Sequence, residues 1–454
     1  MFKYLVVLAV VVRREACCVD VCSWCLCRDN NSDGEDYLGV NVDCSYKGAS
    51  ILDDSYKLTD TVYSLDLSSN NISKLRPTKL LQSPILTRLN LNNNDLEQIP
   101  EGAFKLSELK WLELSNNRLQ FIHKEAFSDI NNLEYLNLAN NRFVSHDNLQ
   151  LHRLRSLNEL VLDGNDLGTS LRVFSLFDRR GFGLTHKIQS LSIRRIDLKE
   201  VPDNFFSDAY DIRKLIISDN QLKEIFELPF TLEYLDLSDN PIEEISEEDF
   251  ADMLALKELY LNNLHIKEVP GFVFDALNSL TVLELERNLN LTVFNPLAFG
   301  QEVLEDADDF LLETLSLKGS RLTVLDGRLE EPFGRLTQLD LQGNPWICNC
   351  NIQWFQSLQI EPENYEHLRC GSPKTLFNAK IFELSPKNLC PTLNDHQVGM
   401  VIAFVAFCVL LTAIALWFFV FIPRYQSRGN CIVSAYTPTA NYTMLPLSSQ
   451  TTSF

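Results

Sequence analysis

A short frame of leucine and asparagine recurs along most of this chain and limits what the chain can fold into. Residues 109–119 read LKWLELSNNRL, in which four leucines surround Asn117. The same frame, L-x-x-L-x-L-x-x-N-x-L, begins at twelve positions: Val62, Leu86, Leu109, Leu133, Leu157, Ile188, Ile212, Leu232, Leu256, Leu280, Leu312 and Leu336. Most starts lie 23 or 24 residues apart. Such a period predicts a solenoid in which each unit packs on its neighbours.

Each part of the frame has a physical role. The L-x-L core alternates with a period of two, which predicts a short strand whose leucines face inward. The asparagine ends the strand, and its amide can satisfy buried backbone groups that would otherwise cost about 1–3 kcal/mol each. Nine units keep this residue: Asn70, Asn94, Asn117, Asn141, Asn165, Asn220, Asn240, Asn288 and Asn344. Ile196, Leu264 and Ser320 replace it, so we expect the asparagine ladder to be weaker in those units.

One unit is too small to fold alone. It buries roughly six apolar side chains at about 2 kcal/mol each, whereas ordering its backbone costs about 1–2 kcal/mol for each residue. Stacking supplies the shared core, and both ends of the stack then need covers. We therefore expect a cap beside the first repeat and another beside the last.

The frame resembles the leucine-rich repeats of animal extracellular proteins. A phenylalanine recurs on the return side of the repeat, as in the spine of that subclass: Phe104, Phe127, Phe206, Phe250, Phe274 and Phe299. The resemblance covers about residues 18–390. It implies an α/β fold, a curved solenoid of about twelve repeats over residues 62–346 with a parallel β-sheet on its concave face.

The amino-terminal end predicts a secretory signal. Residues 1–12 pair Lys3 with an apolar run that is too short to span a bilayer. This pattern is typical of a signal peptide, which we place at residues 1–16. An uncleaved anchor is the alternative.

Twelve cysteines fall mainly at the two ends of the repeat array, and none lies between Cys44 and Cys348. That clustering predicts disulfide caps in an oxidising compartment. Residues 17–61 resemble the amino-terminal cap of the family, whose pairing implies Cys22–Cys27 and Cys25–Cys44. Zinc is the competing interpretation, because C-x-x-C is also a ligand spacing.

Residues 347–390 resemble the carboxy-terminal cap of the same class. The segment NPWICNCNIQWF opens it with two cysteines between two tryptophans, Trp346 and Trp354. Family pairing implies Cys348–Cys370 and Cys350–Cys390. This cap is expected to shield the open edge of the last repeat.

Beyond a linker at 391–397, residues 398–422 carry no charge. Twenty-five residues at about 1.5 Å each exceed the roughly 30 Å thickness of the hydrocarbon core, so this segment predicts a membrane-spanning helix. Arg424 and Arg428 follow it, and a basic flank faces the cytosol. We therefore expect a type I single-pass protein of the plasma membrane, with residues 423–454 as its cytoplasmic tail.

Short motifs in the tail suggest adaptor binding. Tyr442 to Leu445 has the Y-x-x-Φ form of endocytic signals, and Thr452 to Phe454 resembles a class I PDZ ligand. A PDZ domain would pair with the extended terminus as an added strand and hold Phe454 in a pocket. A disordered anchor is the alternative interpretation of the tail.

The concave face is the leading candidate for function. Residues beside the inward leucines point into the horseshoe, and exposed aromatic side chains on rigid strands suit protein recognition. The predicted ligand-binding residues are Arg88, Trp111, Glu113, Tyr135, Glu159, Asp163, Arg194, Lys214, Tyr234, Tyr260 and Glu284. A solvated face with scattered aromatic residues is the other interpretation.

Two long periods place insertions near residues 168–187 and 301–310, and the second is acidic. Insertions in solenoids map to loops and sometimes bind partners; tolerated surface excursions are the simpler interpretation. Sequons at Asn30, Asn71 and Asn290 predict glycosylation in the secretory path.

Neither an enzyme nor a cofactor site is expected. Seven histidines are scattered without HExxH, and the chain lacks GxSxG and a phosphate-binding glycine loop. The net charge of -21 argues against nucleic acid as a partner. The sequence therefore predicts a cell-surface receptor or adhesion protein with an extracellular protein ligand. A self-associating adhesion protein, including a homodimer, and an innate-immune or growth-factor co-receptor remain alternatives.

Overall fold

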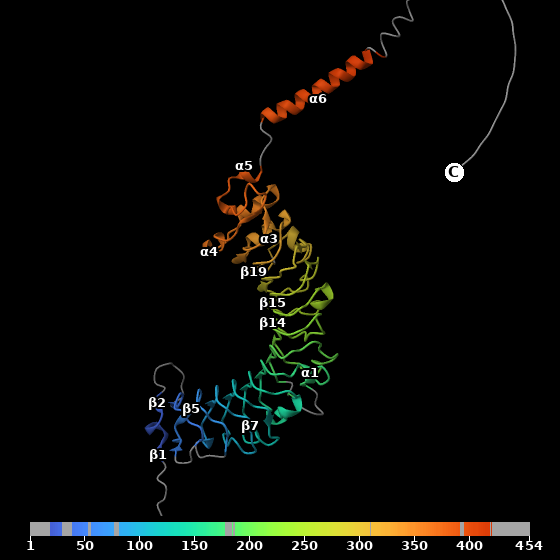
Figure 1. Ribbon diagram of the computed structural model, residues 1–454. Helices are drawn as coiled ribbons and strands as arrows, with labels where there is room; N and C mark the ends of the chain where they lie inside the picture. The colour runs from blue at the N-terminus through green and yellow to red at the C-terminus, as the bar shows by residue number, and fades with distance from the viewer. Residues whose placement is uncertain are drawn as a thin grey trace, which may run out of the picture. The chain divides into compact units, whose positions relative to one another are not determined.

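The structure is a computed structural model that describes residues 19–29, 39–52, 56–76, 81–177, 184, 187–308, 310–390, 395–417 and 419 (Figure 1). It divides into two compact units, residues 1–390 and residues 391–454. Each unit is described by itself. The predicted signal peptide, Asn30 and the tail residues Tyr442, Leu445, Thr452 and Phe454 lie outside the described residues.

The first unit is built on one sheet of fourteen strands, which confirms the predicted solenoid. Twelve parallel strands come from the twelve repeats, and a hairpin of β2 and β3 extends the sheet at the amino-terminal end. In chain order the strands are β2 (Leu26–Asp29), β3 (Val40–Asp43), β5 (Val62–Asp66), β6 (Arg88–Asn90), β8 (Trp111–Glu113), β10 (Tyr135–Asn137), β11 (Glu159–Val161), β12 (Ser190–Ser192), β13 (Lys214–Ile216), β14 (Tyr234–Asp236), β15 (Glu258–Tyr260), β17 (Val282–Glu284), β19 (Thr314–Ser316) and β20 (Gln338–Asp340). Figure 1 shows them following one another along the inner side of an arc.

The strands stack without a shift between repeats. Leu89, Leu112 and Leu136 are direct neighbours in β6, β8 and β10, and all three are fully buried. Since side chains alternate across a strand, the residues that flank each leucine must point to the opposite face. The register of the leucines therefore also aligns the concave residues in columns.

The return side of the repeats is made of turns and short elements. Two pairs of parallel strands lie there, β7 (Gln98–Ile99) with β9 (Phe121–Ile122) and β16 (Glu268–Val269) with β18 (Val293–Phe294). The short helices of this unit are η1 (Val21–Ser23), η3 (His146–Asn148), η4 (Leu151–Arg153), α1 (Gly168–Leu171), η5 (Glu247–Asp249), α2 (Glu302–Glu305), η6 (Gly327–Leu329), α3 (Glu330–Gly334), η7 (Cys350–Ser357), α4 (Pro362–Tyr365), η8 (Ile381–Glu383) and α5 (Pro386–Leu389). The recurring phenylalanines pack behind the sheet, as Phe104 on Phe127 with ring centroids 6.4 Å apart.

The asparagine ladder runs through the core as the frame predicts. Asn117 Nδ2 donates to the carbonyls of Leu91, Leu114 and Ser115 at 3.0–3.1 Å. Its Oδ1 accepts from the amide of Leu96 at 3.1 Å. One side chain thus ties together two successive units. The ladder is interrupted where the sequence lacks the amide, at the three positions named above.

Described parts of both insertions add to the return side. In the first, Phe177 is buried against Phe205 and Phe206, with ring centroids 6.2 and 5.7 Å away. In the second, α2 is exposed or half-buried, and the exposed Asp308 pairs with Arg335 at 2.7 Å. The first insertion therefore contributes to the core, whereas the second displays acidic side chains to solvent.

Both ends of the repeat array carry disulfides. The pairs are Cys22–Cys27, Cys25–Cys44, Cys348–Cys370 and Cys350–Cys390, as the family resemblance implies. A parallel pair of β1 (Val19–Asp20) and β4 (Tyr56–Lys57) lies at the first end, and β21 (Trp346–Ile347) pairs with β22 (Cys370–Ser372) at the second. The fully buried Trp346 donates its indole N–H to the carbonyl of Leu341 at 2.9 Å, which ties the second cap to the last repeat.

The second unit contains the helix α6 (Asp395–Leu416). Its stretch Gly399–Leu416 has a mean hydropathy of 2.7. By length and composition, this helix can cross a membrane.

Candidate protein-binding surface

The eleven predicted ligand-binding residues lie in three neighbouring columns on the concave face. The first column is formed by the first residue of each strand of the sheet from β6 to β14. Its predicted members are Arg88, Trp111, Tyr135, Glu159, Lys214 and Tyr234. The second column contains Glu113, Tyr260 and Glu284. Asp163 and Arg194 follow the ends of β11 and β12. The residues share one face but span units two to ten, so they form a long strip rather than a single centre.

Trp111 and Tyr135 form the first aromatic pair of this strip. They are neighbours in β8 and β10, and their rings stack with centroids 5.2 Å apart and planes 9° apart. Both side chains are half-buried. Burial, followed by the negative charge of Glu113, raises the pKa of Tyr135 to about 12.

Glu113 lies in the predicted column but is more buried than the other predicted residues. It lies on the concave side but is only 8% exposed. Its carboxylate accepts from the amide of Ser115 at 2.8 Å and from Asn137 Nδ2 at 2.9 Å. These bonds hold it against the sheet below the aromatic pair, where it can position Tyr135 but presents little surface to a ligand.

Tyr234 and Tyr260 form the second aromatic pair. Their ring centroids are 5.1 Å apart, and Lys214 Nζ lies 4.6 Å from the centroid of Tyr234. Tyr260 donates its hydroxyl to Glu258 Oε2 at 2.9 Å. Burial, followed by the charge of Asp236, raises the pKa of Tyr234 to about 12, and burial followed by the bond to Glu258 raises the pKa of Tyr260. Both phenols are therefore neutral hydrogen-bonding groups at neutral pH.

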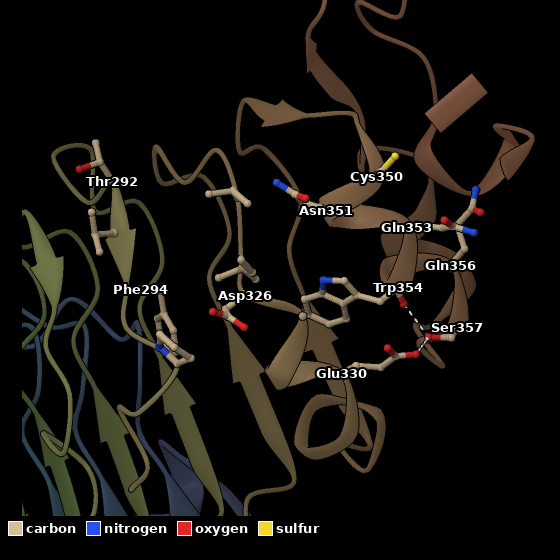
Figure 2. Close-up of a pocket in the computed structure, with 15 residues that line it drawn as sticks. Thr292, Phe294, Asp326, Glu330, Cys350, Asn351, Gln353, Trp354, Gln356 and Ser357 are labelled. Carbon is tan, nitrogen blue, oxygen red and sulfur yellow. Dashed lines mark hydrogen bonds between the residues drawn. The ribbon is translucent and has the colours of Figure 1, made fainter. Parts of the chain in front are cut away.

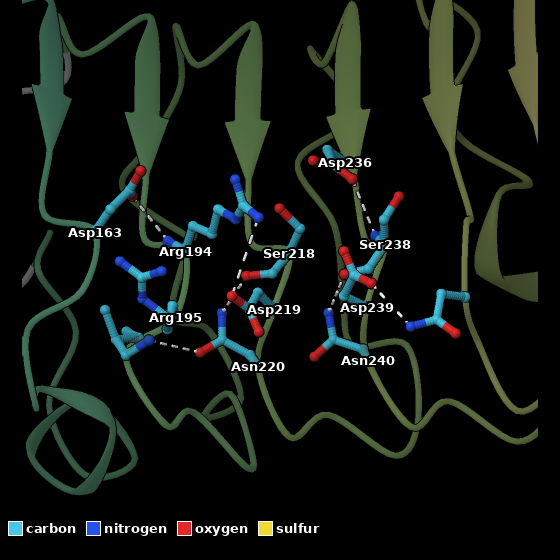
Figure 3. A network of polar contacts seen from close by, with 12 residues as sticks. Asp163, Arg194, Arg195, Ser218, Asp219, Asn220, Asp236, Ser238, Asp239 and Asn240 are labelled. Atoms are coloured by element: carbon cyan, nitrogen blue, oxygen red, sulfur yellow. Dashed lines mark hydrogen bonds and ion pairs between the residues drawn. The ribbon is translucent and has the colours of Figure 1, made fainter. Parts of the chain in front are cut away.

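A polar network occupies the ends of the strands between the two pairs (Figure 3). Asp163 Oδ1 accepts from Ser192 Oγ at 2.7 Å and from the amide of Arg194 at 2.9 Å. The exposed guanidinium of Arg194 reaches Asp219 at 4.0 Å. The network fixes Asp163 and leaves the arginine at the solvent edge, where exposed ion pairs add little stability but can contact a partner.

A cavity of about 1070 Å³ lies beside the second cap and was not predicted from the sequence (Figure 2). Trp354 lines it, although the sequence indicated this residue only as a flank of the cap cysteines. The only sign of this cavity in the sequence was the second tryptophan of the cap segment. The residues that surround Trp354 come from different units, and the repeat frame does not encode such contacts. Across the described residues, His, Cys, Asp and Glu side chains form no group of three or more that could hold a metal ion.

Comparisons with known proteins agree with the fold. The family model described as Leucine rich repeat matches residues 60–117, 107–167 and 212–263. Toll-like receptor 7 of Mus musculus is 28% identical over 352 residues, which cover 72% of this chain and 31% of the receptor. Tsukushi of Gallus gallus is 32% identical over 257 residues, which cover 50% of this chain and 62% of Tsukushi. The chain thus spans less than two thirds of the length of these curated relatives.

A solved structure extends the comparison to three dimensions. A chain in the octameric complex of Latrophilin 3, Unc5D and FLRT2 superposes with a TM-score of 0.51 at 20% identity. The match covers 80% of the present chain and 98% of the solved one. At that identity the likeness concerns the fold alone.

Proposed function

We propose that this chain, whose repeats match the leucine-rich repeat family model and whose ends carry disulfide caps, is an extracellular protein that binds another extracellular protein through its concave face. The proposed setting is the cell surface, with α6 in a single membrane span and residues 17–390 outside. Four disulfides support an oxidising compartment for that part of the chain. Toll-like receptor 7, one of the relatives, is named as a receptor, which supports the same class.

The observation that carries this proposal is the stacked pair Trp111 and Tyr135 on adjacent strands. Large rigid rings bury much area at little entropic cost and are frequent binding hot spots. The β-sheet beneath them fixes their spacing before any partner arrives. Twelve strands about 4.8 Å apart give a strip roughly 55 Å long, which matches the size of a protein rather than of a metabolite.

The composition of the strip indicates the chemistry of the partner. Glu159, Asp163 and Glu284 are half-buried carboxylates, while Arg88, Arg194 and Lys214 are exposed cations. Charges of both signs beside aromatic pairs favour a protein surface of mixed charge over a polyanion. Since rim charges mainly steer association, we expect the aromatic pairs to set the affinity.

The test is capture of binders from a library of surface and secreted proteins by the full chain displayed on cells. For any binder, Trp111→Ala and Tyr135→Ala should each weaken binding by about 1–3 kcal/mol, while the folded chain loses only the roughly 0.5–1.5 kcal/mol of the stacking contact and stays folded. Tyr210→Ala is the matched control, because Tyr210 is an exposed aromatic residue outside the strands of the sheet.

Two outcomes would redirect the proposal. Loss of binding in Tyr210→Ala but not in Trp111→Ala would place the interface away from the concave face. Capture of only a second copy of this chain would favour a self-associating adhesion protein.

A further inference from the structure

The cavity beside the second cap is separate from the concave columns. Its walls come from β18 on the return side, from the loop at residues 324–327 in unit eleven, and from η7 of the cap (Figure 2). At about 1070 Å³ it lies above the roughly 300–1,000 Å³ of small-molecule pockets. This size admits either a small molecule or a short chain segment, so the chemistry of the walls must decide between them.

The indole N–H of Trp354, a residue that lines this cavity, has no hydrogen-bond acceptor among the residues that the structure describes. Its side chain is only 9% exposed, and its ring contacts Phe355 and Phe333 with centroids 4.7 and 6.4 Å away. Among the buried side-chain nitrogens and oxygens of the described residues, Trp354 Nε1 alone has no hydrogen-bond partner. The neighbouring Trp346 satisfies the same indole N–H with a backbone carbonyl, so the absence of an acceptor is particular to Trp354.

The side chains around this N–H are already engaged. Asp326 accepts from Arg328 Nε and Nη2 at 3.1 and 3.0 Å, and Glu330 Oε1 accepts from Ser357 Oγ at 2.7 Å. Gly327 lies against the indole edge: a Cβ there would lie 4.0 Å from Trp354 Nε1. A molecule that fills the cavity must therefore bring its own acceptor to Trp354.

The wall opposite the cap is the edge of a strand. β18 pairs with β16 and, within the described part of the chain, with no strand on its other side. Val293 and Val324 expose 50% and 43% of their surface in this wall. An extended peptide can satisfy such an edge with its backbone groups and cover the valines with its side chains.

We propose that this cavity is a second binding site, which takes an extended peptide segment of a partner protein. A backbone carbonyl of the peptide accepts from Trp354 Nε1, and the peptide lies along β18 as an added strand. Carbohydrate fits less well, because a sugar would stack on an open aromatic face and the Trp354 ring is nine-tenths buried.

The probe is a displayed library of random heptapeptides with blocked ends, panned on the full chain in lipid nanodiscs. Trp354→Phe keeps an aromatic ring at this position but removes the N–H together with the five-membered ring that carries it. Gly327→Ala places a methyl group beside the same atom at a position with ordinary backbone angles. For selected peptides, both changes should weaken binding about tenfold, the scale of one hydrogen bond, whereas Trp111→Ala on the concave face should change nothing.

Stability provides a second, independent readout. Trp354→Phe loses packing but no hydrogen bond, so it should lower the thermal midpoint of the free protein less than a Trp→Phe change that also loses a bond. Trp346→Phe, the matched control, removes a made bond and should lower the midpoint more. A merely structural role for Trp354 predicts equal drops in the midpoint for the two variants and unchanged peptide binding in Trp354→Phe.

A chemical change in the peptide tests the strand geometry. Replacing one amide of a selected peptide by an ester removes an N–H and weakens the carbonyl, so one or two positions should lose about tenfold in affinity. The proposal is overturned if no selected peptide distinguishes the natural chain from Trp354→Phe, or if their binding depends on Trp111. It is also overturned if a sugar array binds through Trp354 and the peptide library does not.

Discussion

The first five units and the last seven units of the solenoid contribute to one sheet, but they differ in how regular their repeat length and asparagine ladder are. Units one to five begin every 23 or 24 residues and all keep the asparagine. Among units six to twelve the spacing varies from 20 to 32 residues, and three units have lost the asparagine. The strands nevertheless continue in register through both regions. The register of the sheet is therefore kept although repeat length varies. The differences in length and the missing asparagines change the return side and the ladder instead.

The junction of units five and six shows how one gap is filled. Unit six has Ile196 in place of the amide, and the Gly168 amide donates directly to the Ile196 carbonyl at 2.7 Å. A Cβ on Gly168 would clash with the carbonyl of Asp197. The backbone at Gly168 thus packs directly on the backbone of unit six, where other units have an asparagine side chain. Only glycine permits so close an approach.

Two of the three gaps follow an insertion. Ile196 belongs to the unit after the 31-residue period, and Ser320 belongs to the unit after the 32-residue period. The asparagine of one unit accepts from an amide of the unit before it, as Asn117 does from Leu96. Before these two gaps the backbone bonds differ: the Gly168 amide donates to the Ile196 carbonyl at 2.7 Å, and the Leu291 amide donates to the Asn288 carbonyl of its own unit at 3.0 Å.

The largest effect is expected from Asn117→Ala in the regular region. The change removes four hydrogen bonds. Leu91 and Leu114 carbonyls keep a second donor from Asn94 and Asn141, so the main loss falls on the buried amide of Leu96. We expect about 2–4 kcal/mol of destabilisation, measured by thermal unfolding with the disulfides intact.

Ser320→Ala is the matched change in the interrupted region. Ser320 Oγ makes one long bond, 3.3 Å to the carbonyl of Leu285, and its loss should cost about 0.5 kcal/mol. Equal effects of the two substitutions would mean that the ladder does not distinguish the regions.

Gly168→Ala is expected to have the next largest effect. The added methyl group must displace the backbone of unit six, and overpacking of this kind costs about 1–3 kcal/mol. Gly334→Ala is the control, because nothing lies within 4 Å of its Cβ position. Amide hydrogen exchange should increase around units five and six in the first variant and nowhere in the second. A neutral Gly168→Ala would show that the backbones at this junction can separate freely.

The periodic part of the molecule could be predicted from the sequence because the spacing of the repeats determines which residues form strands and which face inward. Leucine and asparagine positions specified the sheet, its register and the three interruptions of the ladder. Glu113 lies on the predicted concave side, but its bonds to Ser115 in its own unit and to Asn137 in the next unit leave it only 8% exposed, and the repeat frame does not encode such bonds. The cavity at Trp354 was missed for the same reason, since its walls combine residues from three segments far apart in the chain.

A smaller effect should separate the two aromatic pairs. Trp111 and Tyr135 are nearly parallel, at 9°, while Tyr234 and Tyr260 are tilted by 37°. Double-mutant cycles with alanine should give coupling energies of about 0.5–1.5 kcal/mol in the stability of the folded chain for each pair. Lys214 over Tyr234 adds a second contact to that ring. Coupling near zero for Trp111 and Tyr135 would contradict a rigid, preformed pair.

The smallest effect concerns alkaline pH and asks whether the irregularity of the core reaches the concave surface. Tyr135 stands in the regular region and Tyr234 in the interrupted one, yet burial raises the pKa of each to about 12. Between about pH 10, where an unfolded tyrosine ionises, and pH 12, the unfolded chain loses protons that the folded chain keeps. The contribution of each phenol to stability is therefore complete below pH 10 and is lost as the pH rises through about 12.

Tyrosinate absorbance of the full chain, compared with that of Tyr135→Phe and Tyr234→Phe, measures these two ionisations. Each substitution should remove one step near pH 12. If Tyr234→Phe instead removes a step near pH 10 while Tyr135→Phe removes one near pH 12, the interruptions of the ladder extend to the concave face. If both substitutions remove a step near pH 12, the missing asparagines behind the sheet do not affect the concave surface. This is the expected result, since the leucines of both regions hold the same register.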